Sequence, residues 1–112
     1  MVSGNLFFFF IMHTPTVSVA FQIMPKVAAS PDAIALIDRA IAIVRQSGVT
    51  YEVGPMETTM EGDDLNALFA IVQRAQEACL QGGAESVFIN MKVLANPSGI
   101  MTMHEKTAKH RL

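Results

Sequence analysis

The sequence predicts an α+β fold: a four-stranded antiparallel sheet with two helices on one face, in the order β-α-β-β-α-β, followed by a short C-terminal helix. Three observations lead to this prediction. Apolar and polar side chains alternate in short stretches, two longer stretches carry apolar residues at helical spacing, and glycine or proline separates the stretches. The 112 residues suffice for one domain with one ordinary core.

The first strand and the first helix are predicted in residues 16–48. The strand should turn one set of side chains to the core, Val17, Val19, Phe21 and Ile23, and the opposite set outward, Ser18, Ala20, Gln22 and Met24. We expect Pro25 to end this strand. Ser30 should cap a helix with Pro31 at its first position, and Gly48 should close it. The core side of that helix is expected to carry Ile34, Ile37, Ile41 and Val44.

Residues 49–53 and 56–61 are predicted to form the second and third strands, joined by a tight turn at Gly54 and Pro55. We expect Met56 and Met60 to face the core with Thr58 between them. The outward-facing set is then Glu57, Thr59 and Glu61. A slip of one residue would exchange the two sets, because side chains alternate along a strand.

The second helix should begin after a cap at Asp63 or Asp64 and stop at Gly82. Its inner face is expected to carry Leu65, Leu68, Val72, Ala75 and Cys79, with Phe69 beside them. The fourth strand should span residues 85–94, with Val87, Ile89, Met91 and Val93 on the core side. Thr102 followed by Glu105 is a capping-box pattern that predicts a short final helix.

Two right-handed crossovers between these strands give a ferredoxin-like sandwich, in which the helices cover one face of the sheet and leave the other open. A ligand, a second subunit or both must cover the open face. The polar side chains expected to converge there are Gln22, Thr59, Asn90, Lys92 and a glutamate. This mixture beside Phe88 suits a flat, polar heteroaromatic ligand. The alternative is that these residues are solvated or belong to an interface between subunits.

Composition excludes several classes of protein. A net charge of -2 lacks the positive footprint of a nucleic-acid binder. The single cysteine, Cys79, rules out an internal disulfide and fits a reducing cytoplasm. Residues 6–12 are strongly apolar but far shorter than the ~20 residues of a spanning helix, so we expect no membrane insertion. We expect residues 1–15 to be a disordered extension or one upstream of the true start at Met12, and residues 16–112 to form the domain.

The sequence predicts neither an enzyme nor a metal or cofactor site. His13, His104 and His110 lie in the two tails without ligand-like spacing. No serine or cysteine has an evident histidine partner within the domain. Glu57 and Glu61 are four residues apart on a strand, roughly 13 Å, which is too far for two carboxylates acting on one bond. We therefore name no catalytic residue.

The most specific stretch of the chain is Tyr-Glu-Val-Gly-Pro-Met-Glu-Thr-Thr-Met-Glu-Gly at residues 51–62, and residues 17–25, 75–78 and 105–109 accompany it. Together these stretches resemble the small thiamine-binding protein family, which is related to the YkoF-type binders of thiamine and hydroxymethylpyrimidine. The resemblance runs from about Val17 to Arg111. It implies a ferredoxin-like fold, assembly into a homodimer or homotetramer through sheets and edge strands, and binding of thiamine or its pyrimidine moiety without catalysis.

The resemblance also implies which residues bind the ligand. Gln22, Thr58, Thr59 and Asn90 are the first candidates, and Glu61, Tyr51 and Lys92 come next. Amides can read the edge of an aminopyrimidine, because each offers a donor and an acceptor. The positive thiazolium of thiamine would favour a nearby glutamate and disfavour Lys92, so the preferred ligand depends on where Lys92 points. The alternative function is a structural or regulatory homo-oligomer that senses an unknown small molecule.

Overall fold

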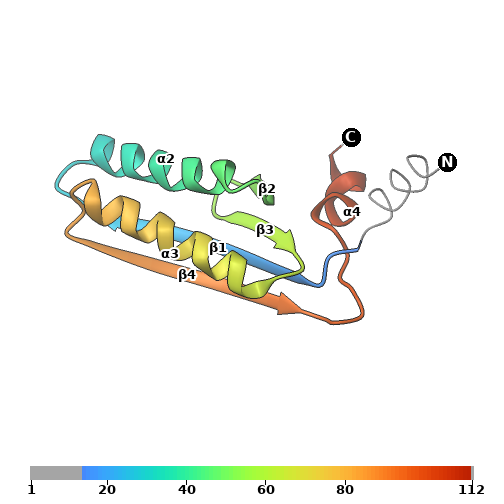
Figure 1. The fold of residues 1–112 in the computed structure, drawn as a ribbon. Helices are drawn as coiled ribbons and strands as arrows, with labels where there is room; N and C mark the ends of the chain where they lie inside the picture. The colour runs from blue at the N-terminus through green and yellow to red at the C-terminus, as the bar shows by residue number, and fades with distance from the viewer. Residues whose placement is uncertain (1–13, 112) are drawn as a thin grey trace.

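The four strands form one antiparallel sheet in the order β2-β3-β1-β4 (Figure 1). The computed structural model describes residues 14–111, apart from the side chains of residues 30 and 31. The elements in chain order are β1 (Val17–Lys26), α2 (Ser30–Gln46), β2 (Thr50–Val53), β3 (Thr58–Gly62), α3 (Leu65–Gln81), β4 (Ser86–Ala95), α4 (Met103–Thr107) and a 3-10 turn, η1 (Ala108–His110). The predicted order and α+β class are confirmed. The expected extension at residues 1–15 lies almost entirely outside the described residues.

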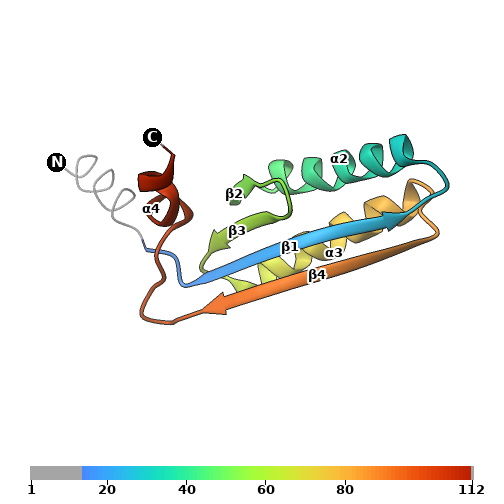
Figure 2. The same ribbon diagram turned by 180° about the vertical axis from the view of Figure 1, so that it is seen from behind.

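Helices α2 and α3 cover one face of the sheet, and the view from behind shows strands β1 and β4 with no helix in front of them (Figure 2). The core between the layers has Val19 and Phe21 of the central strand at its middle, both almost fully buried. Residues of α2, β3 and α3 complete this core: Leu36, Ala40, Val44, Met60, Leu68, Val72, Ala75 and Cys79. Burying one such large apolar side chain contributes about 1.5–3 kcal/mol, so the helix-covered face holds the fold together.

Short-range signals at the helix ends are confirmed where they were clearest. Asp64 caps α3 by accepting a hydrogen bond from the Ala67 N–H at 3.3 Å, and α3 ends at Gln81 with Gly82 as its C-cap. The capping box of Thr102 and Glu105 is present at the start of α4. Helix α2 differs, because Ala29 occupies the cap position and the helix already begins at Ser30.

Several predicted details were wrong. Strand β1 does not end at Pro25 but continues to Lys26. Strand β3 pairs only with residues 17–21 of β1, so the N–H that Pro25 lacks is not needed for a hydrogen bond to β3. Met56 is 70% exposed, since β3 begins only at Thr58. The buried stripe of α2 runs through Leu36, Ala40 and Val44, so Ile34 is exposed. Met91 and Val93 do lie on the predicted side of β4, opposite Phe21 and Val19, but they are 43% and 45% exposed because β4 forms an edge of the sheet.

Candidate ligand-binding site

The open face of the sheet has a floor of small side chains on its central strand. Ala20 of β1 pairs with Thr59 of β3 on one side and with Lys92 of β4 on the other. One step along the same face, Ser18 lies between Glu61 and Leu94. Directly opposite residues in a sheet share a face, so larger side chains flank a low floor. The sequence alternation therefore creates a depression in the middle of the open face.

This depression is a hollow of about 510 Å³. Its floor is Ser18 and Ala20, and strands β3 and β4 contribute Thr59 and Lys92. The turn that joins β2 to β3 supplies a second wall with Met56 and Glu57. The C-terminal helix supplies a third wall with Met103, Lys106 and Thr107. The volume and the mixture of apolar and polar lining are those of a small-molecule site.

Opposite charges are paired around the hollow. The Lys92 ammonium lies 3.1 Å from the Glu57 carboxylate, and both side chains keep contact with solvent. Glu52 of the edge strand β2 also lines the hollow and forms an ion pair with Arg111. The sequence did not show where Lys92 points. In the structure Lys92 lines the hollow, and the Glu57 carboxylate compensates its charge.

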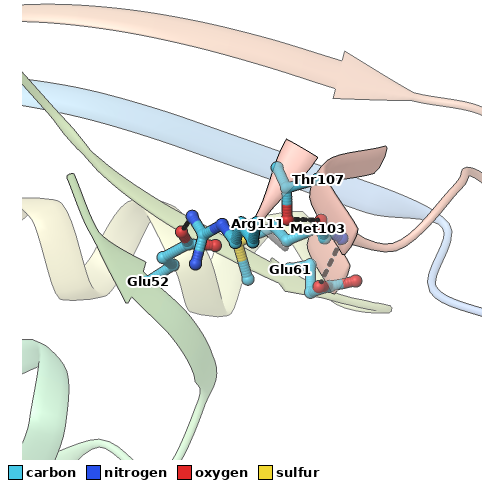
Figure 3. A network of polar contacts seen from close by, with 5 residues as sticks. All are labelled: Glu52, Glu61, Met103, Thr107 and Arg111. Atoms are coloured by element: carbon cyan, nitrogen blue, oxygen red, sulfur yellow. Dashed lines mark hydrogen bonds and ion pairs between the residues drawn. The ribbon is translucent and has the colours of Figure 1, made fainter. Parts of the chain in front are cut away.

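Glu61 lies at the end of the open face where α4 begins, and it contacts the C-terminal segment directly. Its side chain accepts a hydrogen bond from the Met103 N–H at 3.1 Å (Figure 3). Glu61 is only 8% exposed, although the chain around it reaches the surface. This carboxylate is thus engaged with the protein backbone.

The seven residues predicted to bind a ligand fall into three groups. Thr59 and Lys92 line the hollow, and Glu61 lies beside it under α4. Gln22 and Asn90 are opposite each other on the same face, one step beyond Ala20 and Lys92. The Asn90 amide donates to the Gln22 carbonyl oxygen at 3.5 Å, which is long for a hydrogen bond and leaves both amides accessible.

Tyr51 and Thr58 occupy the opposite side of the sheet. Thr58 pairs with Phe21 and Tyr51 pairs with Met60, whose side chains belong to the core, so both polar residues face the helices. Thr58 is 6% exposed. Neither residue lines the hollow, although Thr58 lines a separate pocket with Gln22 and Tyr51 lines another with Glu61.

Sequence reasoning missed the contribution of β2 and of the C-terminal helix. Glu52 pairs with Thr59, which places it on the open face, and this results from the register of the hairpin. Met103, Lys106 and Thr107 reach the hollow because α4 lies beside the end of the sheet formed by β2 and β3 (Figure 2). The capping box indicated that this helix exists, but no local pattern indicates where a short helix docks.

Within residues 14–111, the pKa values of Glu105 and Cys79 are shifted. The pKa of Glu105 is lowered because its carboxylate accepts a hydrogen bond from the Thr102 backbone N–H at 2.9 Å, and the Thr102 side chain adds to the effect. Burial raises the pKa of the Cys79 thiol, and the charge of Arg39 partly opposes this. A raised pKa keeps the thiol protonated and unreactive. Among residues 14–111, no group of three His, Cys, Asp or Glu side chains is arranged to hold a metal ion.

Comparison with known proteins identifies the family. The sequence profile described as "Thiamine-binding protein" matches residues 19–111, which contain both sheet faces and the C-terminal helix. The chain belongs to the thiamine-binding protein family. A UPF0045 protein of Clostridium perfringens is 41% identical over 96 residues, which cover 86% of this chain and 98% of that protein. The predicted membership of this family is thereby confirmed.

Solved structures of similar proteins share the fold. A domain of unknown function, DUF77, from Bacillus cereus is 44% identical, with a TM-score of 0.76 and coverage of 88% of this chain and 92% of that one. A Thermotoga maritima protein, described as a "putative thiamine biosynthesis/salvage protein", is 30% identical, with a TM-score of 0.74 and coverage of 87% and 100%. In the described part of this chain, no helix is long and apolar enough to cross a membrane.

Proposed function

We propose that this protein binds thiamine or its hydroxymethylpyrimidine moiety without catalysing a reaction, in a cytoplasmic salvage or transport role. The observation that carries the proposal is the hollow over Ser18 and Ala20 in a chain of the thiamine-binding family. A planar aminopyrimidine can lie on a floor without large side chains, and Thr59 offers it a hydroxyl. Glu52 and Glu57 also line the hollow, and a thiazolium would compete with Arg111 and Lys92 for their carboxylates.

Gln22 and Asn90 complete the proposed site at its outer end. They lie one step beyond the hollow on the same face, roughly 7 Å along the strands. Each amide offers both a donor and an acceptor to the edge of a pyrimidine. Their mutual hydrogen bond is long, at 3.5 Å, so exchanging it for a bond to a ligand costs little.

Calorimetric titration with thiamine and with hydroxymethylpyrimidine tests the proposal. The decisive variant is Ala20→Leu, which raises the floor at the centre of the hollow while leaving the helix-covered core untouched. We expect the affinity to fall about five- to a hundredfold, because misfit of added carbon atoms costs about 1–3 kcal/mol. Ala67→Leu makes the same change on the exposed face of α3 and should bind normally. Absence of heat with both ligands at millimolar concentration would refute the proposal.

A second candidate function, a structural or regulatory homo-oligomer, is favoured by one observation. Strand β4 is an edge of the sheet and exposes several apolar side chains: Phe88, Met91, Val93 and Leu94. A long, apolar edge strand is a template for pairing with another chain. Two measurements on wild type and Asn90→Ala separate the two functions: sedimentation reports assembly, and calorimetric titration reports ligand binding. Loss of ligand with assembly retained favours the binder, whereas loss of assembly favours the oligomer.

A further inference from the structure

The C-terminal segment, residues 101–111, lies beside the end of the sheet formed by β2 and β3, and it has no core of its own (Figure 2). Neither α4 nor η1 contains a buried residue. The residue before the segment is different: Ile100 is buried, and its N–H donates to the Pro15 carbonyl at 2.8 Å. The chain is therefore anchored at Ile100, and residues 101–111 depend on surface contacts to stay on the sheet.

Two polar contacts attach the segment to the sheet, one near each end (Figure 3). At its start, the Met103 N–H donates to the Glu61 carboxylate at 3.1 Å. Met103 is the first residue of α4, so this N–H has no partner within the helix. At its end, Arg111 forms an ion pair with Glu52 on the edge strand β2. Both contacts join the segment to strands that line the hollow.

The helix of this segment also has bonds that do not involve the sheet. The capping box satisfies the backbone N–H groups of Thr102 and Glu105. The Thr107 hydroxyl donates to the Met103 carbonyl at 2.9 Å. These local bonds persist if the segment leaves the sheet, so the segment can move as a unit about the chain after Ile100. Glycine at residue 99, with φ of 112°, lies just before this anchor.

We propose that Glu61 is a positioning residue that holds this segment as a movable wall of the ligand hollow, with the Glu52–Arg111 ion pair as the second attachment. The inference rests on the proposed function and assigns Glu61 a role other than contact with the ligand. Met103, Lys106 and Thr107 complete the hollow only while the segment is attached. A ligand between them and Ala20 leaves when the segment detaches, so attachment sets the dissociation rate.

The consequence for affinity depends on the population of the attached state. When the segment is attached in only a fraction of the molecules, the apparent Kd equals the Kd of the attached state divided by that fraction. A hydrogen bond to a charged group contributes about 1.5–3 kcal/mol, equivalent to roughly ten- to a hundredfold in the attachment equilibrium. Glu61→Ala removes the acceptor, whereas Glu61→Gln keeps a carbonyl oxygen that can accept the same N–H.

The first readout is cleavage of the full-length protein by trypsin without ligand, because Lys106 and Lys109 lie within the segment. We expect Glu61→Ala to accelerate cleavage after Lys106 about tenfold or more, and Glu61→Gln to restore most of the protection. Arg111→Glu should also accelerate cleavage after Lys106, because it removes the ion pair with Glu52. The double variant Glu52→Arg with Arg111→Glu restores an opposite-charge pair and should regain the protection. Glu77→Ala, on the exposed side of α3, is the control and should leave cleavage unchanged.

The second readout is the dissociation rate of thiamine or hydroxymethylpyrimidine. We expect Glu61→Ala to release the ligand about tenfold faster with little change in the association rate, and Glu61→Gln to stay close to wild type. Saturating ligand should slow cleavage after Lys106 in wild type.

The outcomes separate this inference from the proposed function. If wild type binds and Glu61→Ala releases ligand at the wild-type rate despite faster cleavage, the segment is not a wall of the site and the inference is wrong. Unchanged cleavage in Glu61→Ala refutes the attachment itself, with or without ligand. If wild type binds neither ligand, the proposed function is wrong. The role of the segment as a wall of a ligand site is then wrong as well, even if the cleavage assay shows that Glu61 attaches the segment to the sheet.

Discussion

Replacing Lys92 with methionine tests how charge at the hollow selects between a cationic and a neutral ligand. The Lys92 ammonium lies 3.1 Å from the Glu57 carboxylate, and its side chain is 75% exposed. Lys92→Met removes the positive charge, keeps an unbranched side chain beside Ala20, and leaves Glu57 free to face a ligand cation. The hollow therefore gains one unit of negative charge with little change of shape.

The size of the effect can be worked out from Coulomb's law. A thiazolium about 5 Å from Glu57 is stabilised by about 1 kcal/mol in surroundings close to water, the dielectric suited to a side chain this exposed. That energy corresponds to about fivefold in affinity. We expect Lys92→Met to bind thiamine about fivefold more tightly, whereas its affinity for uncharged hydroxymethylpyrimidine should stay within about twofold.

The assay is calorimetric titration with both ligands at mildly alkaline pH, at low salt and at about 0.15 M salt, where the Debye length is ~8 Å. The gain for thiamine should be smaller at the higher salt. Lys92→Arg keeps the charge and should resemble wild type. Lys26→Met changes the net charge equally, but Lys26 is six residues beyond Ala20 on β1, roughly 20 Å away, and should have no effect. Equal changes for both ligands, or weaker thiamine binding, would refute the electrostatic reasoning.

Two further predictions concern the fold. Met60→Ala should lower the free energy of unfolding by about 2–5 kcal/mol in urea denaturation, because Met60 is 0% exposed and its loss leaves a cavity. Met56→Ala is the matched control and should change it by less than about 0.5 kcal/mol, because Met56 is 70% exposed; equal losses would contradict the placement of β3. The hydrogen bond from the Thr102 N–H lowers the pKa of Glu105 in the folded state. The Glu105 carboxylate therefore stabilises the fold fully above the pKa that Glu105 has in the unfolded chain, and this stabilisation is lost as the pH falls through the lower pKa of the folded state. The Thr102 amide NMR signal should therefore titrate with a midpoint below that of an ordinary glutamate and should not titrate in Glu105→Gln; a midpoint at the ordinary value would show that the capping box does not form in solution.

Local patterns predicted much of the fold because their causes are local. Apolar alternation in β1 identified the core set of Val17, Val19, Phe21 and Ile23, all of which are buried. Asp64 and the pair of Thr102 and Glu105 marked helix starts, since capping bonds span only three residues. The opposite set on β1 correctly indicated the open face, because side chains in a strand point alternately to its two sides.

The candidate site was only partly predictable, because register and docking depend on contacts between distant residues. Alternation correctly directed Thr59 to the open face and Thr58 toward the helices, but it left open a slip of one residue that would exchange them. That assignment is decided by the pairing of β3 with β1, and a shift of one residue would reverse it.

The order of elements, the buried face of α3 and the small-residue floor at Ser18 and Ala20 could all be inferred from the chain without coordinates. The three-dimensional arrangement was needed to show that Glu61, predicted to contact a ligand, accepts the Met103 N–H from 42 residues away. It was also needed to show that Arg111 returns to Glu52 and that α4 forms a wall of the hollow. The cause of this difference is that a five-residue helix without buried residues carries no apolar stripe to reveal its docking surface. Its position is set by a few polar contacts to strands that precede it by tens of residues.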